Sequence, residues 1–293
     1  MLKKLYRNNK NEIESLSVSI GTYGENAYSH QILEYELYRI YKKCKRIKNF
    51  DVKKEFKTIK NMMVLRNAKQ RDNVSNIGDF LSSGEGWNSM LAVQMLVLIR
   101  NGDSFKVMIV QRSNTVAVAP GDYQMVPAGA FEIFNNKRPE YAEHEVISNL
   151  SPGAAVFREF LEEIIGESDC DGHGPGGVNE MLTSNKELQK IFTLLDNKEA
   201  AFRFLGVVAD LTYLRHYLSF VLVISNLDYC KNTVFRGNDE AMNNAFLYNE
   251  ATINTIENNN ELWDNLFPPS AGMWALFKQL IDNKDEELLK LLS

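Results

Sequence analysis

The chain has 293 residues, of which 44% are hydrophobic and 24% are charged, and it contains three cysteines. This composition excludes a wholly disordered, collagen-like or membrane-embedded protein. The widely separated cysteines argue against a disulfide framework and against a cysteine zinc site. The N-terminus lacks the apolar segment of a signal peptide, and no apolar run is long enough to span a bilayer. The sequence therefore predicts a soluble, cytoplasmic protein.

Charge is unevenly distributed along the chain. Residues 1–85 contain 17 basic and 10 acidic residues, a balance of +7, whereas the residues from 86 onward carry −12. Such asymmetry is typical of a basic arm for an anionic partner, or of a basic segment that packs on an acidic body. We favour packing, because the sequence contains no DNA-reading motif and no zinc finger. A nucleic-acid partner is the weaker alternative.

The first part of the chain is predicted to be largely helical. Residues 28–48 form an amphipathic helix in this interpretation, because apolar side chains recur at helical spacing. A loop rich in Ser, Gly and Asn follows at residues 72–89 and is typical of a domain boundary. We therefore divide the chain into a basic N-terminal accessory region, residues 1–85, and a second domain, residues 86–293.

From Met90 onward the pattern is typical of strands. Two apolar runs flank the turn signal at 101–104, which predicts a hairpin. Further strands are expected within 123–131, 202–211 and 217–225, with a helix at 152–165 and a closing helix near the C-terminus. Strands around an inserted helix predict an α/β protein of the α+β type, with a mixed β-sheet sandwiched between helices.

The helix at 152–165 carries the clearest chemical signal. Ser151 is a good N-cap and Gly166 a plausible stop. Glu159, Glu162 and Glu163 follow one another at i, i+3 and i+4, so they lie on one side of the helix, where like charges repel. A divalent cation that prefers oxygen ligands would relieve this repulsion. The alternative is a solvated acidic face with an Arg158–Glu162 pair.

The segments VPAGAFE and SPGAAVFREFLEEIIG together resemble the signature of the Nudix hydrolase superfamily. Gly129 and Glu132 match its first part, and the run from Arg158 to Glu163 matches its helix. The flanking strands extend the resemblance over roughly residues 88–281. Three features depart from the family pattern. The loop after Glu132 is enlarged, Leu150 replaces a glutamate, and two residues instead of one separate Glu163 from Gly166.

The resemblance implies a Nudix-like fold and a role for each matching residue. Glu159, Glu162 and Glu163 would bind Mg²⁺ or Mn²⁺, and Arg158 would orient them through a charge-assisted hydrogen bond. The backbone of Gly129 would approach the substrate or the metal. The family often adds a distal acid. Here the candidate is Glu240, beside Asp239, and an exposed loop acid is an equally good interpretation.

Three other patterns receive less weight. Residues 169–180 fit part of a calcium-loop pattern, but His173 occupies a ligand position, so a glycine-rich loop beside the active site is the better interpretation. Glu143, His144 and Glu145 stand in a polar insertion and are expected to be solvated. His216 could contact substrate, and a structural role is slightly favoured. Signatures of nucleophile-elbow hydrolases, P-loop NTPases and dinucleotide-binding Rossmann enzymes are absent.

The resulting hypothesis is a divalent-metal-dependent hydrolase that cleaves a pyrophosphate bond in a small nucleoside-diphosphate-linked substrate. The alternative is a non-catalytic Nudix-like module that senses a nucleotide or sugar-nucleotide and binds a partner through its N-terminal region. The sequence predicts neither the nucleoside nor the appended group. It also leaves the oligomeric state open, with a homodimer as one option.

Overall fold

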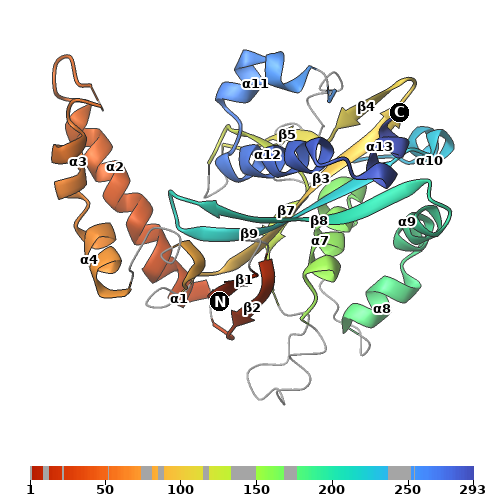
Figure 1. The fold of residues 1–293 in the computed structure, drawn as a ribbon, viewed down its shortest axis with the longest axis horizontal. Coiled ribbons are helices and arrows are strands. Elements are labelled where there is room, and N and C mark those ends of the chain that lie inside the picture. Colours follow the sequence, from red (N-terminus) through yellow and green to blue (C-terminus); the bar gives the residue numbers. More distant parts are fainter. Residues whose placement is uncertain are drawn as a thin grey trace. The chain divides into compact units, whose positions relative to one another are not determined.

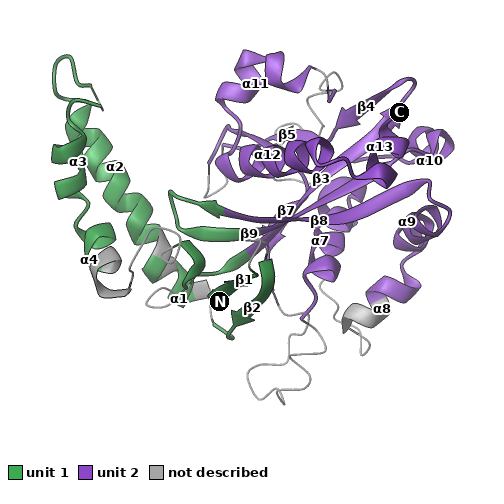
Figure 2. Ribbon diagram, viewed as in Figure 1, with its two compact units in different colours: residues 1–91, 209–217 green, residues 92–208, 218–293 purple. Residues whose placement is uncertain are grey.

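The computed structural model describes residues 2–8, 13–21, 23–51, 53–73, 81–84, 89–114, 119–132, 150–167, 177–236, 252–253 and 255–293. The chain divides into two compact units (Figure 2). The first comprises Met1–Leu91 and Ala209–Tyr217, and the second comprises Ala92–Val208 and Leu218–Ser293. Residues 209–217, which sequence analysis placed in the second domain, thus belong to the first compact unit. The accessory role of residues 1–85 stays a prediction.

The first unit begins with a β-hairpin that sequence analysis did not predict, in which β1 pairs antiparallel with β2. The predicted helix at 28–48 is present as a short π-helical segment followed by α2. The elements of this unit are β1 (Leu2–Arg7), β2 (Ile13–Val18), α1 (Tyr23–Asn26), η1 (Ala27–Gln31), α2 (Ile32–Cys44), α3 (Phe56–Met62) and α4 (Val64–Asn73). Helix α2 buries Ile40 and Cys44 against Ile59 of α3, as its apolar spacing requires.

His216 has a structural role in the first unit. Its ring is buried, with Nε2 2.5 Å from the carbonyl oxygen of Leu81 and Nδ1 3.4 Å from the hydroxyl of Ser89. The neutral tautomer donates from Nε2 to Leu81 and leaves Nδ1 as an acceptor for the Ser89 hydroxyl, whose single hydrogen is shared with the carbonyl of Leu214 at 3.2 Å. Burial lowers the pKa of His216 below its usual value, and the hydrogen bond to Leu81 offsets this only in part. The ring therefore stays neutral in the folded protein.

This lowered pKa predicts a loss of stability in mild acid. Below the pKa of about 6.5 that His216 has in the unfolded chain, the unfolded chain binds a proton at this residue and the folded chain does not. The free energy of unfolding therefore falls as the pH drops from 6.5 towards the pKa of His216 in the folded protein. Above pH 6.5 this contribution is fully present. In His216→Gln that part of the pH dependence should disappear. Thermal melts of both proteins between pH 5 and 8 test this, and parallel curves would contradict it.

The second unit contains the predicted sheet, with strand order β4-β3-β9-β8 and β7 paired with β3 (Figure 1). Its strands are β3 (Leu91–Asn101), β4 (Ser104–Val107), β5 (Ile109–Gln111), β6 (Tyr123–Met125), β7 (Ala128–Ala130), β8 (Ala200–Asp210) and β9 (Arg215–Ile224). Its helices are α7 (Pro152–Phe160), η2 (Leu161–Ile165), α8 (Gly177–Ser184), α9 (Lys186–Asp196), α10 (Leu227–Asn232), η4 (Ile256–Asn258), α11 (Asn260–Asp264), α12 (Pro268–Asp282) and α13 (Glu286–Leu292).

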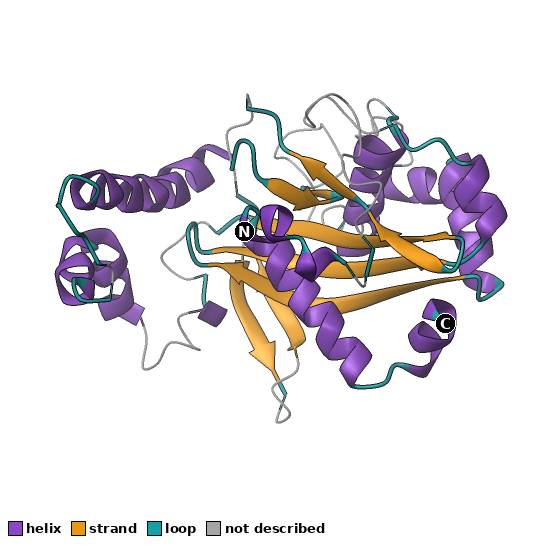
Figure 3. Ribbon diagram, turned by 90° about the horizontal axis from the view of Figure 1, so that it is seen from above, coloured by secondary structure: helices purple, strands orange, loops and turns teal. Residues whose placement is uncertain are grey.

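Helices cover both faces of this sheet (Figure 3). On one face, Phe157 of α7 packs on Phe202 of β8, with ring centroids 4.9 Å apart. On the other face, Trp274 and Phe277 of α12 join a core that includes Leu96 of β3. Strand β3 is therefore apolar at almost every position, because neither face meets water. The predicted fold class, a mixed β-sheet between helices, is confirmed.

The predicted hairpin is present as β3 and β4, which pair from Leu98 opposite Val107 to Asn101 opposite Ser104. The extended segment at 123–131 consists of β6 and β7, joined through a cis peptide bond between Val126 and Pro127. Strand β7 pairs antiparallel with β3, with Gly129 opposite Val93. This pairing places the first part of the predicted motif beside β3. Within the described part of the chain, no helix is long and apolar enough to cross a membrane.

Candidate active site

The glutamate-bearing helix begins and ends where the sequence predicts. The Ser151 hydroxyl accepts a hydrogen bond from the backbone N–H of Ala154 at 3.2 Å, and Pro152 occupies the first helical position. Gly166 ends the helix in the left-handed conformation, with φ of 78°. These local features fix the length of the helix and hence the direction in which its glutamates project.

The extra residue between Glu163 and Gly166 is accommodated by a change of helix type. Residues Leu161–Ile165 form a π-helical turn, and the backbone N–H of Gly166 bonds to the carbonyl of Leu161, five residues earlier. A π turn holds one more residue than an α turn, and such turns recur at functional sites. This departure from the family pattern therefore leaves the helix continuous through Glu162 and Glu163.

Glu159 lies directly over Gly129 of β7. A Cβ atom built on Gly129 would stand 2.1 Å from the carboxyl carbon of Glu159 and 2.2 to 2.4 Å from its two oxygens. Only glycine leaves room for the carboxylate at this place. Gly129 therefore approaches Glu159 closely, and the predicted approach of its backbone to a substrate or metal stays a prediction.

Arg158 connects the glutamates with β7. Its guanidinium donates to Glu159 at 2.5 Å and to the carbonyl of Ala130 at 3.4 Å, and its Nε lies 3.9 Å from Glu162. Both Arg158 and Glu159 are buried. Burial alone would lower the pKa of Arg158, but the carboxylates of Glu159, Glu162 and Glu132 raise it above its usual value. Arg158 thus stays charged and holds Glu159 in place.

Glu163 is anchored by the backbone of the same strand. It is buried, and its carboxylate accepts a hydrogen bond from the N–H of Ala128 at 2.8 Å. Strand β7 therefore contacts the helix through Ala128, Gly129 and Ala130, one after another. Sequence reasoning missed Ala128 and Ala130, because backbone donors and acceptors leave no side-chain pattern. The small residues around Gly129 were the only signal available.

The donor chemistry of this site suits a hard divalent cation, but the acids do not form a closed cage. Among the residues that the structure describes, no three His, Cys, Asp or Glu side chains are grouped to hold a metal. Glu159 and Glu163 lie against β7, whereas Glu162 is partly exposed. Mg²⁺ keeps several waters and needs only one or two protein carboxylates. These oxygen donors fit such a partly hydrated ion.

Several predicted residues lie outside the described part of the chain: Glu240, Asp239, the enlarged loop at 133–149 with Glu143, His144 and Glu145, and residues 168–176 of the glycine-rich segment. Their roles stay predictions. Residues 177–180 of that segment begin helix α8. Glu132 is exposed beyond the end of β7.

The helix that lies over β7 carries the motif that resembles the Nudix signature. No family model matches the chain, and no curated protein matches it. Among solved structures, the chain is similar to the Nudix hydrolase RenU from M. smegmatis, with 13% identity over 67% of this chain and 88% of that chain, at a TM-score of 0.35. It is also similar to a MutT/nudix family protein from Enterococcus faecalis, with 15% identity over 78% of each chain, at a TM-score of 0.37.

A third similar structure is a bifunctional NMN adenylyltransferase/ADP ribose pyrophosphatase from Francisella tularensis. Its identity is 12% over 65% of this chain and 41% of that chain, at a TM-score of 0.34. The first two of these structures are described as Nudix proteins, and all three TM-scores lie below 0.5.

Proposed function

We propose that this protein is a divalent-metal-dependent hydrolase that cleaves a pyrophosphate bond in a nucleoside-diphosphate-linked compound. The observation that carries the proposal is the placement of Glu159 over Gly129, with Arg158 and Glu163 bonded to the same strand. A cytoplasmic location and a small-molecule substrate belong to the same proposal.

Each residue has a defined part in this mechanism. Glu159, Glu162 and Glu163 would hold Mg²⁺ or Mn²⁺, which supplies charge neutralisation and a more acidic bound water. Arg158 orients Glu159 through a charge-assisted hydrogen bond. The missing side chain at Gly129 leaves space for the carboxylate, and the Ala128 N–H fixes Glu163. Catalysis then depends on positioning and electrostatics, as expected for phosphoryl chemistry.

Metal binding tests the first step of this proposal. In Glu162→Gln/Glu163→Gln the side-chain oxygen of residue 163 still accepts from Ala128, so the fold is retained and only charge is lost. We expect calorimetric titration with Mn²⁺ to show binding at least about 10-fold weaker than in wild type, because a hard cation requires anionic oxygens.

The matched control is Glu286→Gln/Glu287→Gln, which removes two adjacent exposed acids from α13. It should bind Mn²⁺ as wild type does. Equal Mn²⁺ affinity in the Glu162→Gln/Glu163→Gln protein would contradict the assignment of these ligands.

A second candidate function is the non-catalytic sensing module, and two observations favour it. The described acids do not converge on one point. In addition, the solvent face of α2 presents a strip of exposed tyrosines, each with a cation four residues later near its ring. The pairs are Tyr35 with Arg39 at 5.9 Å, Tyr38 with Lys42 at 4.5 Å, and Tyr41 with Lys45 at 5.8 Å. Such a surface suits a partner. Turnover by the purified protein decides between the two functions.

A further inference from the structure

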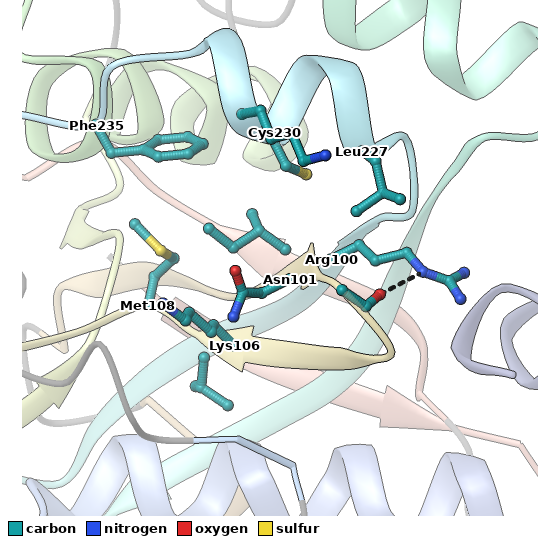
Figure 4. Close-up of a pocket in the computed structure, with 11 residues that line it drawn as sticks. Arg100, Asn101, Lys106, Met108, Leu227, Cys230 and Phe235 are labelled. Carbon is teal, nitrogen blue, oxygen red and sulfur yellow. Dashed lines mark hydrogen bonds between the residues drawn. The ribbon is translucent and has the colours of Figure 1, made fainter.

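A second feature of the Nudix-like unit is a cavity between helix α10 and the β3–β4 hairpin (Figure 4). Its volume is about 300 Å³, which is at the lower end of the range for small-molecule sites. None of the described residues assigned to the glutamate site lines it. The cavity is therefore a separate site, with its own set of side chains.

The cavity is electropositive on an acidic body. Arg100, Lys106 and Lys231 line it, and none of its lining residues in the described part of the chain is acidic. By contrast, the chain from residue 86 onward carries a net charge of −12. Arg100 already donates from Nε to the carbonyl of Gly102 at 3.2 Å and lies over the Phe105 ring. Lys106 and Lys231 are therefore the cations available to a ligand, and the charge selects an anion.

The rest of the lining suits a flat, partly polar ring. The Phe235 side chain points into the space above the hairpin, Met108 lies beside it, and the Asn101 amide rises from the end of β3 (Figure 4). Leu227 closes another side. Aromatic and thioether groups pack on ring faces. An amide offers both a donor and an acceptor, which complements the edge of a nucleobase.

Strand β3 connects this cavity with the glutamate site. Ala128, which binds Glu163, pairs with Gln94, and Met108 bonds from its N–H to the carbonyl of Val97 at 3.1 Å. Val97 is three positions beyond Gln94 on β3, so the two places lie roughly 10 Å apart along the strand. The span is comparable to the distance between the base and the phosphates of a nucleotide.

Both places also lie on the same face of β3. Val93, opposite Gly129, and Ile99, in the cavity lining, are separated by an even number of residues and so point the same way. The residue after Phe235 is tied to the helix itself, since the backbone N–H of Arg236 bonds to the carbonyl of Ile164 at 2.9 Å. This bond holds the end of the cavity wall next to the π turn of the glutamate-bearing helix.

We propose that this cavity binds the nucleoside monophosphate part of the ligand. The base packs between Phe235 and Met108 with its edge at Asn101, the phosphate extends towards the glutamate site, and the positive charge of Lys106 and Lys231 attracts the anionic ligand. This assignment rests on the proposed hydrolase function for the identity of the whole substrate, but binding of a nucleotide to the cavity requires neither metal nor turnover.

The experiment is calorimetric titration of AMP, GMP, CMP and UMP into the full chain in the presence of EDTA. We expect at least one of them to bind, and to bind at least about 10-fold tighter than ribose 5-phosphate, because stacking of the base contributes. Lys106→Gln/Lys231→Gln should weaken that nucleotide at least 10-fold. Phe235→Ala should remove the preference over ribose 5-phosphate.

The matched control is Lys190→Gln/Lys278→Gln, which removes two exposed lysines from α9 and α12 of the same unit. It should bind like wild type, and thermal melts should show all variants folded.

If no nucleoside monophosphate binds, or if Lys106→Gln/Lys231→Gln binds the nucleotide with unchanged affinity, the cavity is not a nucleotide site. Nucleotide binding without any hydrolysis would keep this site and overturn the hydrolase. Hydrolysis with an unchanged KM in Lys106→Gln/Lys231→Gln would keep the hydrolase and overturn this cavity as the nucleotide site.

Discussion

Replacing Gly129 with alanine is expected to reduce turnover at least about 100-fold, because the new methyl group occupies the place of the Glu159 carboxylate and a displacement of about 1 Å is enough for such a loss. The carboxylate is the movable end of a side chain, so the protein should still fold. Overpacking of this kind lowers the free energy of unfolding by about 1 to 3 kcal/mol. Steady-state kinetics and urea unfolding measure the two effects separately.

Gly153→Ala is the matched control for this substitution. Gly153 lies in the first turn of α7, and a Cβ atom there would meet only Phe202, at 3.9 Å. Alanine favours a helix over glycine by about 1 kcal/mol, so this variant should be as stable as wild type or more stable, and fully active. A Gly129→Ala protein with wild-type turnover would show that the contact with Glu159 has no catalytic importance.

Glu159→Gln is expected to abolish hydrolysis, with a loss of roughly 1,000-fold or more, since removal of a group that stabilises the transition state has effects of this size. The amide is nearly isosteric but removes the negative charge that a cation and Arg158 both require. Nucleotide affinity in the absence of metal should be retained. Kinetics and metal-free titration on the same preparation separate the loss of chemistry from a loss of binding.

Stability must be measured alongside, because Glu159→Gln leaves Arg158 with a weaker set of partners. Breaking a buried ion pair lowers the free energy of unfolding by about 3 to 5 kcal/mol. Arg158 keeps its contacts with Ala130 and Glu162, so the loss in this variant should be about 3 kcal/mol or less. Glu287→Gln, at an exposed ion pair with Arg203, is the control and should change little.

The outcomes of the Glu159→Gln experiment distinguish the competing functions. A hydrolase loses turnover in the variant and keeps its nucleotide. A sensing module shows no turnover in either protein. Full hydrolysis by Glu159→Gln would overturn both, because the glutamate-bearing helix would then not be the site.

Sequence alone determined the elements whose causes are local. The helix from Pro152 to Ile165 was predictable because a capping serine, a proline in the first turn and a terminal glycine act within a few residues of one another. The β3–β4 hairpin followed from its turn signal, and β8 and β9 followed from their apolar runs. The glutamate triplet was visible for the same reason, since helical spacing places its members on one side.

The tertiary structure decided which groups the glutamates meet. Gly129 and Glu159 are far apart in the sequence and no periodic pattern links them, so only the packing of the glutamate-bearing helix on β7 brings them together. The contacts of Arg158 with Ala130 and of Glu163 with Ala128 involve backbone atoms, which every residue has and which therefore carry no signal in a sequence. The cavity beside Phe235 likewise depends on α10 packing over a hairpin distant in the chain. Contacts of this kind depend on long-range packing, and only the folded chain specifies them.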